Sequence, residues 1–528
     1  MPSLDPARRN PARRNRFLMR FLSRRFLLWI ILLAALIRAW NLGSGAFWSD
    51  ETYTMLTAVN PDPIKSLVSI ENSPPLYYAF FMPLWASIST SEAWARIPSL
   101  LAGLGCVILA FRMARRISST RAGIIAALLV ACDAYLVTHS REARAYTIAA
   151  FFSFWAIVET IEVAETSSTR AWIRLGLALL AACYTHYVEL IFGIASAGLL
   201  VIRRPEKRTF VGLAIITFCG IAAFLPWLRL MTAQMFKGNW YLPVWSGTAV
   251  GELPWKDGLY YIHRLLAWAF LYNTPPAIYR LLYYFLPVPI LLTALFLARP
   301  LWSVSSIRSS ACFASLLLVL IAILWGLGAI REPVYVQALF ILLLVILAVS
   351  VSEGINRKGI FAFISIALIA LLLLLDGAGI VEMHRNHFHL EDRLTREPWH
   401  RIMNVVKERE TSCDAIVVMP GWGTPAAWYL SRPERKPFYL IWYDSPYFRR
   451  MAPFARVSPG EPEALAEMIR TKYRRILVIR SRPGFYPRES EFWSAMGGVE
   501  KIRDEIMVGE VRIGILETLP ISDTFELR

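Results

Sequence analysis

Charged residues are scarce in this chain. Asp, Glu, Lys and Arg make up 18% of its 528 residues, whereas 56% are hydrophobic, and the mean hydropathy is +0.45. This balance excludes an ordinary soluble globular protein, in which about a quarter of the residues are charged. Several apolar runs are long enough to cross a hydrocarbon core of about 30 Å, which indicates a polytopic membrane protein.

Cysteine is also scarce, and its placement indicates no disulfide framework. The chain has 6 cysteines, and all except Cys413 fall in apolar runs without metal-type spacing. Four histidines cluster near the start of the charged region: His384, His387, His389 and His400. Without cysteine or a fixed acidic partner, such a cluster is more typical of a polar linker than of a metal site. We therefore predict no metal site and no firm cofactor, and a divalent cation stays open.

No internal repeat and no low-complexity tract is present. The first apolar run lacks a small-residue cleavage site and is too long for the core of a signal peptide, so we expect it to be retained as an anchor. The apolar runs predict about eleven membrane spans. They lie near residues 26–42, 94–111, 122–139, 144–161, 171–187, 188–202, 209–230, 281–298, 310–328, 333–351 and 359–376.

Positive charge is distributed unevenly along the chain. Lys and Arg number 56 against 39 Asp and Glu, which gives a net charge of +17. Arginines crowd the segment before the first span, and further basic residues gather in alternate loops, as expected for loops on the cytoplasmic side. The amino terminus is therefore predicted inside and everything after about residue 377 outside. Because this topology accounts for the basic tail, nucleic-acid binding is not expected.

Composition divides the chain into three predicted parts. Residues 1–25 form a basic cytoplasmic tail, residues 26–378 a transmembrane domain, and residues 379–528 a soluble domain on the outer side. Two outer loops are expected within the transmembrane domain. Residues 43–92 are too polar to span twice and suggest short helices on the membrane, whereas residues 232–279 are rich in Trp and Tyr, as is typical of the headgroup level.

The soluble part shows the pattern of a small α/β domain. Short apolar runs at 415–419 and 475–479 predict buried strands. The segments 399–409 and 462–473 read as helices. Strands that alternate with helices predict an α/β fold for this part.

Two adjacent carboxylates, Asp50 and Glu51, follow the first predicted span in the sequence Phe-Trp-Ser-Asp-Glu-Thr-Tyr. Acidic residues are favoured in the first turn of a helix, so capping alone would explain the pair. Four further motifs stand beside the ends of apolar runs on the same predicted face, which favours chemistry at a lipid surface. They are Ser73-Pro-Pro-Leu-Tyr77-Tyr, Ser-Arg141-Glu-Ala-Arg144-Ala-Tyr146, Tyr-Thr-His186-Tyr and Arg331-Glu-Pro-Val-Tyr.

Arg141 and Arg144 lie three residues apart, so on a helical turn they would point the same way. Two guanidinium groups suit a phosphate, which arginine binds with paired hydrogen bonds, and a lipid headgroup is the obvious phosphate at a membrane. Tyr146 could add a hydroxyl donor. The alternative is that both arginines are snorkelling anchors at helix ends.

His186 ends an apolar run, and Glu189 follows in the next. A histidine there is most often a hydrogen-bonding group at a helix end. Glu189 and Asp133 are ionisable groups inside predicted spans, where such groups are costly and tend to face a cavity. An arginine on a neighbouring helix is the structural alternative for both carboxylates.

In this order and on one face, the motifs resemble bacterial GT-C glycosyltransferases of the family 39 type, relatives of protein O-mannosyltransferases and of the lipid A aminoarabinose transferase. The resemblance runs through roughly residues 1–350, and residues 396–423 also resemble the tail of such proteins. It implies an all-α GT-C membrane domain with a small C-terminal α/β periplasmic domain, in the bacterial inner membrane.

The resemblance also implies an activity. Such enzymes take a sugar from a polyprenyl-phosphate carrier and transfer it, with inversion, to an acceptor hydroxyl of a lipid, glycan or protein. A multispan transporter or lipid flippase is the alternative. A transporter would place polar residues near the midplane, often in two related halves, whereas here they gather at one predicted face and no second half repeats the first.

The same resemblance assigns roles to individual residues. Asp50 would be the catalytic base, with Glu51 beside it. Ser73 departs from the family, because relatives often have His or Lys before Pro-Pro, which removes the expectation of a basic phosphate contact from this loop. The donor phosphate would be held by Arg141, Arg144, Tyr146 and Arg331. Further substrate contacts would come from Ser73, Tyr77, His186 and Glu189.

Overall fold

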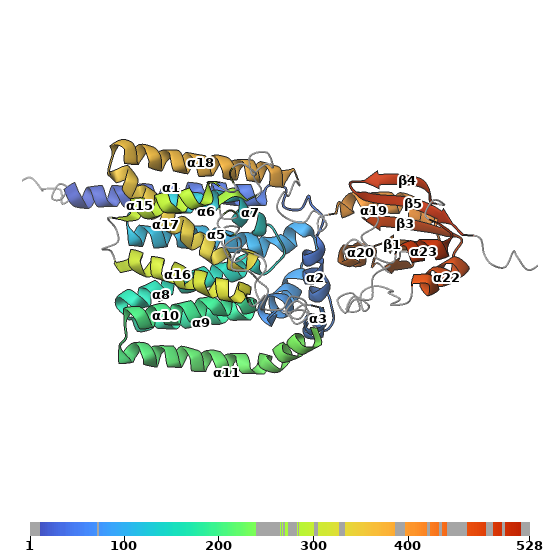
Figure 1. Ribbon diagram of the computed structural model, residues 1–528, viewed down its shortest axis with the longest axis horizontal. Coiled ribbons are helices and arrows are strands. Elements are labelled where there is room, and N and C mark those ends of the chain that lie inside the picture. The colour runs from blue at the N-terminus through green and yellow to red at the C-terminus, as the bar shows by residue number, and fades with distance from the viewer. Residues whose placement is uncertain are drawn as a thin grey trace, which may run out of the picture. The chain divides into compact units, whose positions relative to one another are not determined.

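The computed structural model is mostly helical, and its described chain forms two compact units (Figure 1). The first unit comprises Met1–Trp40, Arg96–Pro226 and Tyr241–Leu390, and the second comprises Asn41–Ala95, Trp227–Trp240 and Glu391–Arg528. The described residues are 11–70, 73–238, 265, 267, 270–272, 282, 285–299, 305–326, 333–385, 397–419, 423–431, 436–440, 462–481, 489–498 and 502–518.

The first unit is built from long apolar helices. Each apolar run that we predict as a span overlaps one of these helices. Inside a bilayer the backbone has no water to bond with, and a helix satisfies its N–H and C=O groups internally. The helices are α1 (Pro11–Ala39), α5 (Glu92–Ile117), α6 (Thr120–Cys132), α7 (Ala134–His139), α8 (Tyr146–Thr166), α9 (Thr169–Thr185), α10 (Leu190–Arg203), α11 (Lys207–Gly238), α15 (Pro287–Ala298), α16 (Ser305–Gly326), α17 (Gln337–Asn356) and α18 (Gly359–His384). The first residues of α5 and the last of α11 belong to the second unit.

Within the described residues, five helices are long and apolar enough to cross a membrane, which fits a multi-pass membrane protein. Their burial differs strongly. In the most apolar window of α17, 83% of the residues are buried, against 22% in α18 and 6% in α11. A helix that is apolar all round and buried forms a core, so α17 is the core of this unit, whereas α11 presents exposed apolar side chains of the kind that face lipid. These include Phe218, Ile221 and Leu225.

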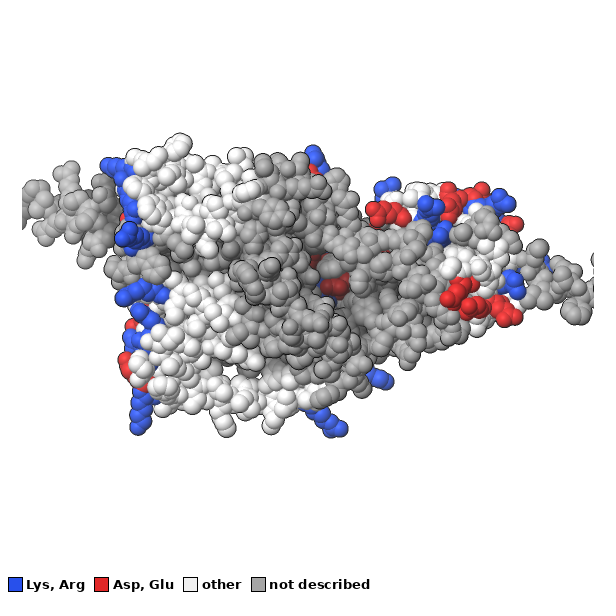
Figure 2. Space-filling view, viewed as in Figure 1, with Lys and Arg blue, Asp and Glu red and all other residues white. Residues whose placement is uncertain are grey.

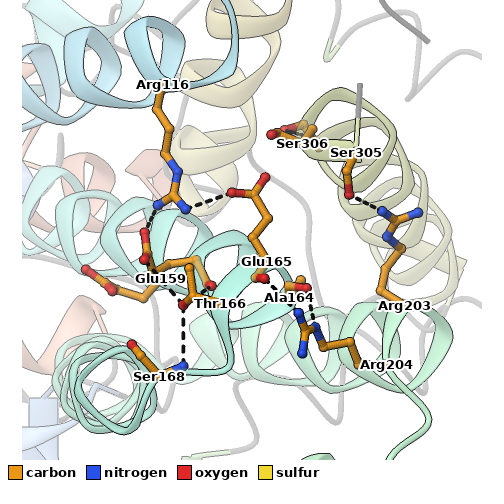
Figure 3. A network of polar contacts seen from close by, with 12 residues as sticks. Arg116, Glu159, Ala164, Glu165, Thr166, Ser168, Arg203, Arg204, Ser305 and Ser306 are labelled. Carbon is orange, nitrogen blue, oxygen red and sulfur yellow. Dashed lines mark hydrogen bonds and ion pairs between the residues drawn. The ribbon is translucent and has the colours of Figure 1, made fainter. Parts of the chain in front are cut away.

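Basic side chains gather at one end of the first unit (Figure 2). This end holds the close of α5 and α10 and the beginning of α9, α11 and α16, so the basic alternate loops do share one end (Figures 1 and 3). In Figure 3, Arg116 of α5 pairs with Glu165 of α8 at 2.7 Å. Arg204 donates to the carbonyls of Ala164 and Glu165, each at 2.6 Å, and so satisfies the carbonyl groups left open at the end of α8.

The run 122–139, predicted as a span, is divided between two helices, α6 and α7, with a break at Asp133. Asp133 Oδ1 accepts the N–H of Leu136 at 2.7 Å, and Asp376 Oδ1 of α18 accepts the N–H of Ala134 at 3.0 Å. On the other side of the break, Arg38 donates to carbonyls at the end of α6, to Ala131 at 2.7 Å and Val130 at 3.2 Å. Ionisable side chains thus satisfy the backbone groups that the break releases.

In the second unit, short helices occupy the predicted outer loop 43–92, as expected. These are α2 (Ser49–Ala58), α3 (Pro63–Ile70), the π-helix Leu76–Phe81 and α4 (Met82–Ala86). The π-helix is followed at once by α4, whose second residue is Pro83. Proline has no N–H, so Pro83 cannot donate to a carbonyl of the π-helical turn that precedes it.

The rest of the second unit is an α/β region with a five-stranded sheet in the order β2-β1-β3-β5-β4. The β1 strand is parallel to β2 and β3, whereas β5 is antiparallel to β3 and β4. The strands are β1 (Ala415–Met419), β2 (Phe438–Leu440), β3 (Arg475–Ser481), β4 (Ile502–Val508) and β5 (Val511–Glu517), and the helices are α19 (Trp399–Arg409), α20 (Gly423–Leu430), α22 (Pro462–Lys472) and α23 (Glu489–Met496). This confirms the small α/β fold, with β1, β3, α19 and α22 at the predicted positions.

Alternate residues of β1 and β3 serve two hydrophobic clusters. Ile416 and Val418 pack in a cluster with Trp399 of α19, whereas Ala415 and Val417 pack in one with Phe492 of α23. Both faces of the central strands are therefore covered, which explains why their sequences read as continuous apolar runs rather than as alternating ones.

Candidate active site

The two adjacent carboxylates of the Asp-Glu motif stand in different environments in the first turn of α2. Glu51 is fully buried, and its Oε2 accepts the backbone N–H of Trp48, the residue before the helix, at 3.3 Å. Asp50 is half-buried. The capping explanation therefore describes Glu51, while Asp50 is the carboxylate with the more accessible position.

Ser73 and Tyr77 surround the start of the π-helix. Ser73 is buried, and its carbonyl accepts a hydrogen bond from Gln234 Nε2 of α11 at 3.1 Å. Tyr77 is buried and its ring stacks on Phe81 with centroids 6.2 Å apart. Phe81 in turn stacks on Trp85 at 5.7 Å. This aromatic column fixes the helix on which Tyr77 stands, and short π-helical pieces are frequent at functional sites.

The segment 140–145 is a turn rather than a helix, so the expectation that Arg141 and Arg144 share a helical turn is wrong. Arg141 Nη1 donates to the carbonyls of Ile37 at 3.3 Å and of Arg38 and Trp40 at 2.7 Å. These carbonyls lie at the end of α1, where the helix leaves its last acceptors open. Arg141 therefore ties the turn to α1.

Arg144 is buried and lies against Tyr146. Its Nη2 donates to the Tyr146 hydroxyl at 3.1 Å, and its guanidinium carbon lies 5.1 Å from the centre of the Tyr146 ring. The Arg144 carbonyl accepts a hydrogen bond from Ser99 Oγ at 2.9 Å. The backbone and the side chain of Arg144 are thus both held in place, which is how a binding arginine keeps its fork oriented.

His186 lies near this pair, with its ring 6.1 Å from the Tyr146 ring. Its Nδ1 accepts the N–H of Val188 at 3.3 Å, which agrees with the helix-end role that we considered. Glu189 is buried and accepts a hydrogen bond from Ser153 Oγ at 2.5 Å.

The first unit thus brings Arg144, Tyr146 and His186 together. Arg331 lies outside the described residues.

The sequence did not point to two polar contacts made by residues in or beside these motifs. His139 Nδ1, at the end of α7, lies 3.0 Å from Glu142 Oε2 in the turn that follows, and their spacing of three residues was the signal that could have found this pair. Gln337 is buried at the start of α17, and its Oε1 accepts from Thr147 at 3.5 Å. Among the described residues, no group of three or more His, Cys, Asp or Glu could hold a metal ion.

Comparisons with known proteins agree with this architecture. Residues 72–229 match the family model described as dolichyl-phosphate-mannose-protein mannosyltransferase. The fold is similar to that of ArnT from Cupriavidus metallidurans in the apo state, with a TM-score of 0.60, 10% identity and coverage of 94% of this chain and 98% of that one. The same protein bound to undecaprenyl phosphate gives a TM-score of 0.57, 11% identity and coverage of 92% and 97%. No curated protein matches the sequence.

At these identities the structural likeness shows the fold, and the family model adds a match in sequence over part of the membrane region. Together they confirm the resemblance that the motifs predict, and with it a multi-pass membrane protein. The roles of individual residues stay predictions.

Proposed function

We propose that this chain is a glycosyltransferase of the GT-C type that takes a sugar from a polyprenyl-phosphate carrier and transfers it, with inversion, to a hydroxyl of a periplasmic lipid, glycan or protein. The strongest support is that the fold of a protein crystallised with undecaprenyl phosphate extends over 92% of this chain. The proposed location is the bacterial inner membrane, with the amino terminus in the cytoplasm and the domain boundaries as predicted from the sequence.

Asp50 is the proposed catalytic base. Inversion in one step requires a base that removes the proton of the acceptor hydroxyl while the sugar leaves its carrier. The half-buried position of Asp50 supports this role, because a base must be reached by the acceptor. Glu51, fully buried and bonded to the Trp48 amide, supports the site by fixing the start of α2.

Arg144 and Tyr146 are the proposed principal contacts of the donor phosphate. The phosphate gains negative charge as the glycosyl bond breaks, and a preoriented guanidinium stabilises that charge. The buried position of Arg144 and its hydrogen bond to Tyr146 support this role. Arg331 is proposed as a further phosphate contact from the sequence alone. Arg141 is retained as a candidate, although its contacts with α1 favour a role in holding the turn.

Further contacts with the two substrates are proposed for the remaining residues of the motifs. Tyr77 stacks on Phe81 in the aromatic column, and Gln234 donates to the Ser73 carbonyl. Both contacts support a fixed position for the segment that carries Ser73 and Tyr77. The proximity of His186 to Tyr146 supports a place beside the donor phosphate. These proposed contacts are Ser73, Tyr77, His186 and Glu189.

Reconstitution separates this function from transport. The purified protein is placed in vesicles that contain an undecaprenyl phosphate-linked, radiolabelled sugar, and pools of lipid A, extracted glycolipid, polysaccharide or envelope protein are added as acceptors. A glycosyltransferase moves the label to one acceptor pool and leaves undecaprenyl phosphate behind. A flippase moves the intact lipid between leaflets without cleavage, and that result would overturn the proposal. Addition of a chelator in a parallel reaction tests the divalent cation.

A further inference from the structure

One tyrosine of the α/β region is hydrogen-bonded to the loop that precedes the Asp-Glu motif. The hydroxyl of Tyr429, in α20, accepts the backbone N–H of Phe47 at 2.8 Å. The same hydroxyl donates to Glu92 Oε1 at 2.8 Å. Phe47 is 1% exposed and lies three residues before Asp50, so its amide has little access to water as an alternative acceptor.

Other side chains hold Tyr429 in this position. Its ring stacks on Trp399 of α19, with centroids 6.0 Å apart and planes within 5° of parallel. The Glu92 oxygen that accepts from Tyr429 also lies 2.7 Å from His400 Nε2. Both the ring and the hydroxyl of Tyr429 are therefore oriented by contacts that converge from α19 and from the start of α5.

The electrostatics of this group favour a neutral hydroxyl. Burial and the neighbouring Glu92 carboxylate raise the pKa of Tyr429 above its ordinary value. A neutral phenol has one proton to donate and lone pairs to accept with. The Tyr429 hydroxyl can therefore donate to Glu92 and accept from Phe47 at the same time, as the two distances require.

Apolar packing joins the same elements. Tyr53 and Leu56 of α2 belong to one hydrophobic cluster with Trp399 and with Ala427 of α20. The ring of Phe47 also meets Trp428 edge-on, with centroids 5.8 Å apart. The helix that begins with the Asp-Glu motif is thus seated on α20, and the Tyr429 hydroxyl is the polar contact that fixes where its preceding loop lies.

We infer that Tyr429 and Glu92 are positioning residues for the reaction, and that through them the C-terminal α/β region holds Asp50 in its working place. The inference rests on the proposed function, in which Asp50 is the base. Neither residue is proposed to touch a substrate. Misplacement of a catalytic group by about 1 Å can cost about 100-fold in rate, so a shift of this loop acts on turnover rather than on donor binding.

Tyr429→Phe tests the inference, because it keeps the ring on Trp399 and removes only the hydroxyl. We expect kcat to fall at least about tenfold while KM for the undecaprenyl phosphate-linked sugar changes less than about twofold. Hydrogen exchange of the backbone amides of residues 47–53 should become at least about fivefold faster. Glu92→Gln keeps an acceptor oxygen for Tyr429 and should retain more activity than Glu92→Ala, which should resemble Tyr429→Phe.

Tyr439→Phe is the matched control. The Tyr439 hydroxyl lies 2.7 Å from that of Tyr473, so this variant also removes a hydrogen-bonded phenol from the α/β region. Both kcat and the exchange of residues 47–53 should stay at the wild-type values.

The outcomes separate this inference from the proposed function. Faster exchange in Tyr429→Phe with an unchanged kcat would overturn the positioning role, because the hydroxyl would then serve folding alone. Equal losses in Tyr439→Phe, or equal activities of Glu92→Gln and Glu92→Ala, would overturn it as well. If the wild-type protein transfers no sugar, the proposed function fails, and exchange alone decides whether Tyr429 holds the loop: unchanged rates would refute it.

Discussion

Two neighbouring residues of one helical turn can serve different purposes because their side chains are buried to different degrees. Glu51 is buried and satisfies the amide of Trp48, whereas Asp50 is half-buried in the same turn. A buried carboxylate that accepts a backbone hydrogen bond stabilises the fold. A base needs access to its substrate. The proposed assignment of Asp50 as the base and Glu51 as its support comes from the family resemblance, and this difference in burial agrees with it.

The first prediction concerns these carboxylates. Asp50→Asn should lower sugar transfer by about 10²- to 10⁴-fold, because an amide cannot accept the acceptor proton. The change is nearly isosteric, so expression and binding of the polyprenyl-phosphate donor should survive. Glu51→Gln should cost less activity. The measurement is transfer of labelled sugar in vesicles, with donor binding as the control; near-normal transfer by Asp50→Asn with an inactive Glu51→Gln would exchange the two roles.

The second prediction separates the two arginines of the turn. Arg144→Lys should lose transfer by at least about tenfold, since lysine keeps the charge but lacks the fork that binds two phosphate oxygens. Arg141→Lys should retain most activity, because an ammonium group has three donors for the carbonyls that Nη1 now contacts. Transfer rates at equal expression provide the test. Equal losses of sugar transfer in both variants would indicate that Arg141 also binds the donor phosphate.

For individual residues, the sequence predicts motifs but not the partners that lie far away along the chain. Local spacing indicated the carboxylate pair and the arginine turn. Glu92 and Tyr429 are 337 residues apart, and neither stands in a motif. Such a contact depends on how the α/β region packs on α2, and no periodicity in a single sequence encodes that packing.

Helices were predictable where composition alone determines them. A long apolar run forms a helix because an apolar medium leaves backbone groups no other partner, and the predicted runs accordingly overlap helices. The break at Asp133 escaped prediction for a physical reason. Its backbone groups are satisfied by Arg38 and Asp376 from other helices, and apolar composition carries no information about those partners.

The strands of the sheet were likewise predictable only in part. The central strands β1 and β3 are continuous apolar runs and were predicted. The edge strand β4 is mostly exposed along its length and has the sequence Ile-Arg-Asp-Glu-Ile-Met-Val, in which only the last three residues form an apolar run. It is a strand because it pairs with β5, and pairing is a tertiary property that sequence patterns reflect weakly.

The third prediction tests the helix break. Asp376→Leu removes the acceptor of the Ala134 N–H and should lower the free energy of unfolding by about 1–3 kcal/mol, the usual cost of a buried donor without a partner. Asp376→Asn keeps Oδ1 and should cost clearly less. Thermal unfolding of both variants in detergent gives the comparison. Equal stability of Asp376→Leu and the wild type would show that the hydrogen bond at 3.0 Å contributes nothing to the fold.

For the whole molecule, the distribution of charge is the main guide to topology. The basic loops of the first unit share one end (Figure 2), and retention of basic loops on the cytoplasmic side is the strongest determinant of orientation. The loop between α17 and α18, which contains Lys358, is one of these basic loops. Residues beyond α18 should therefore lie on the opposite side of the membrane from Lys358.

The last prediction follows from that asymmetry. An alkaline phosphatase reporter, which folds only in the oxidising periplasm, should be active when fused after Arg528 and inactive when fused after Lys358. A reporter that fluoresces only in the cytoplasm should give the reverse pattern at the same two positions. Phosphatase activity at Lys358 without activity at Arg528 would show that the protein has the opposite orientation in the membrane. The carboxylates and arginines of the proposed site would then have no access to a periplasmic acceptor, and the transfer reaction proposed for them would have to take place on the cytoplasmic side.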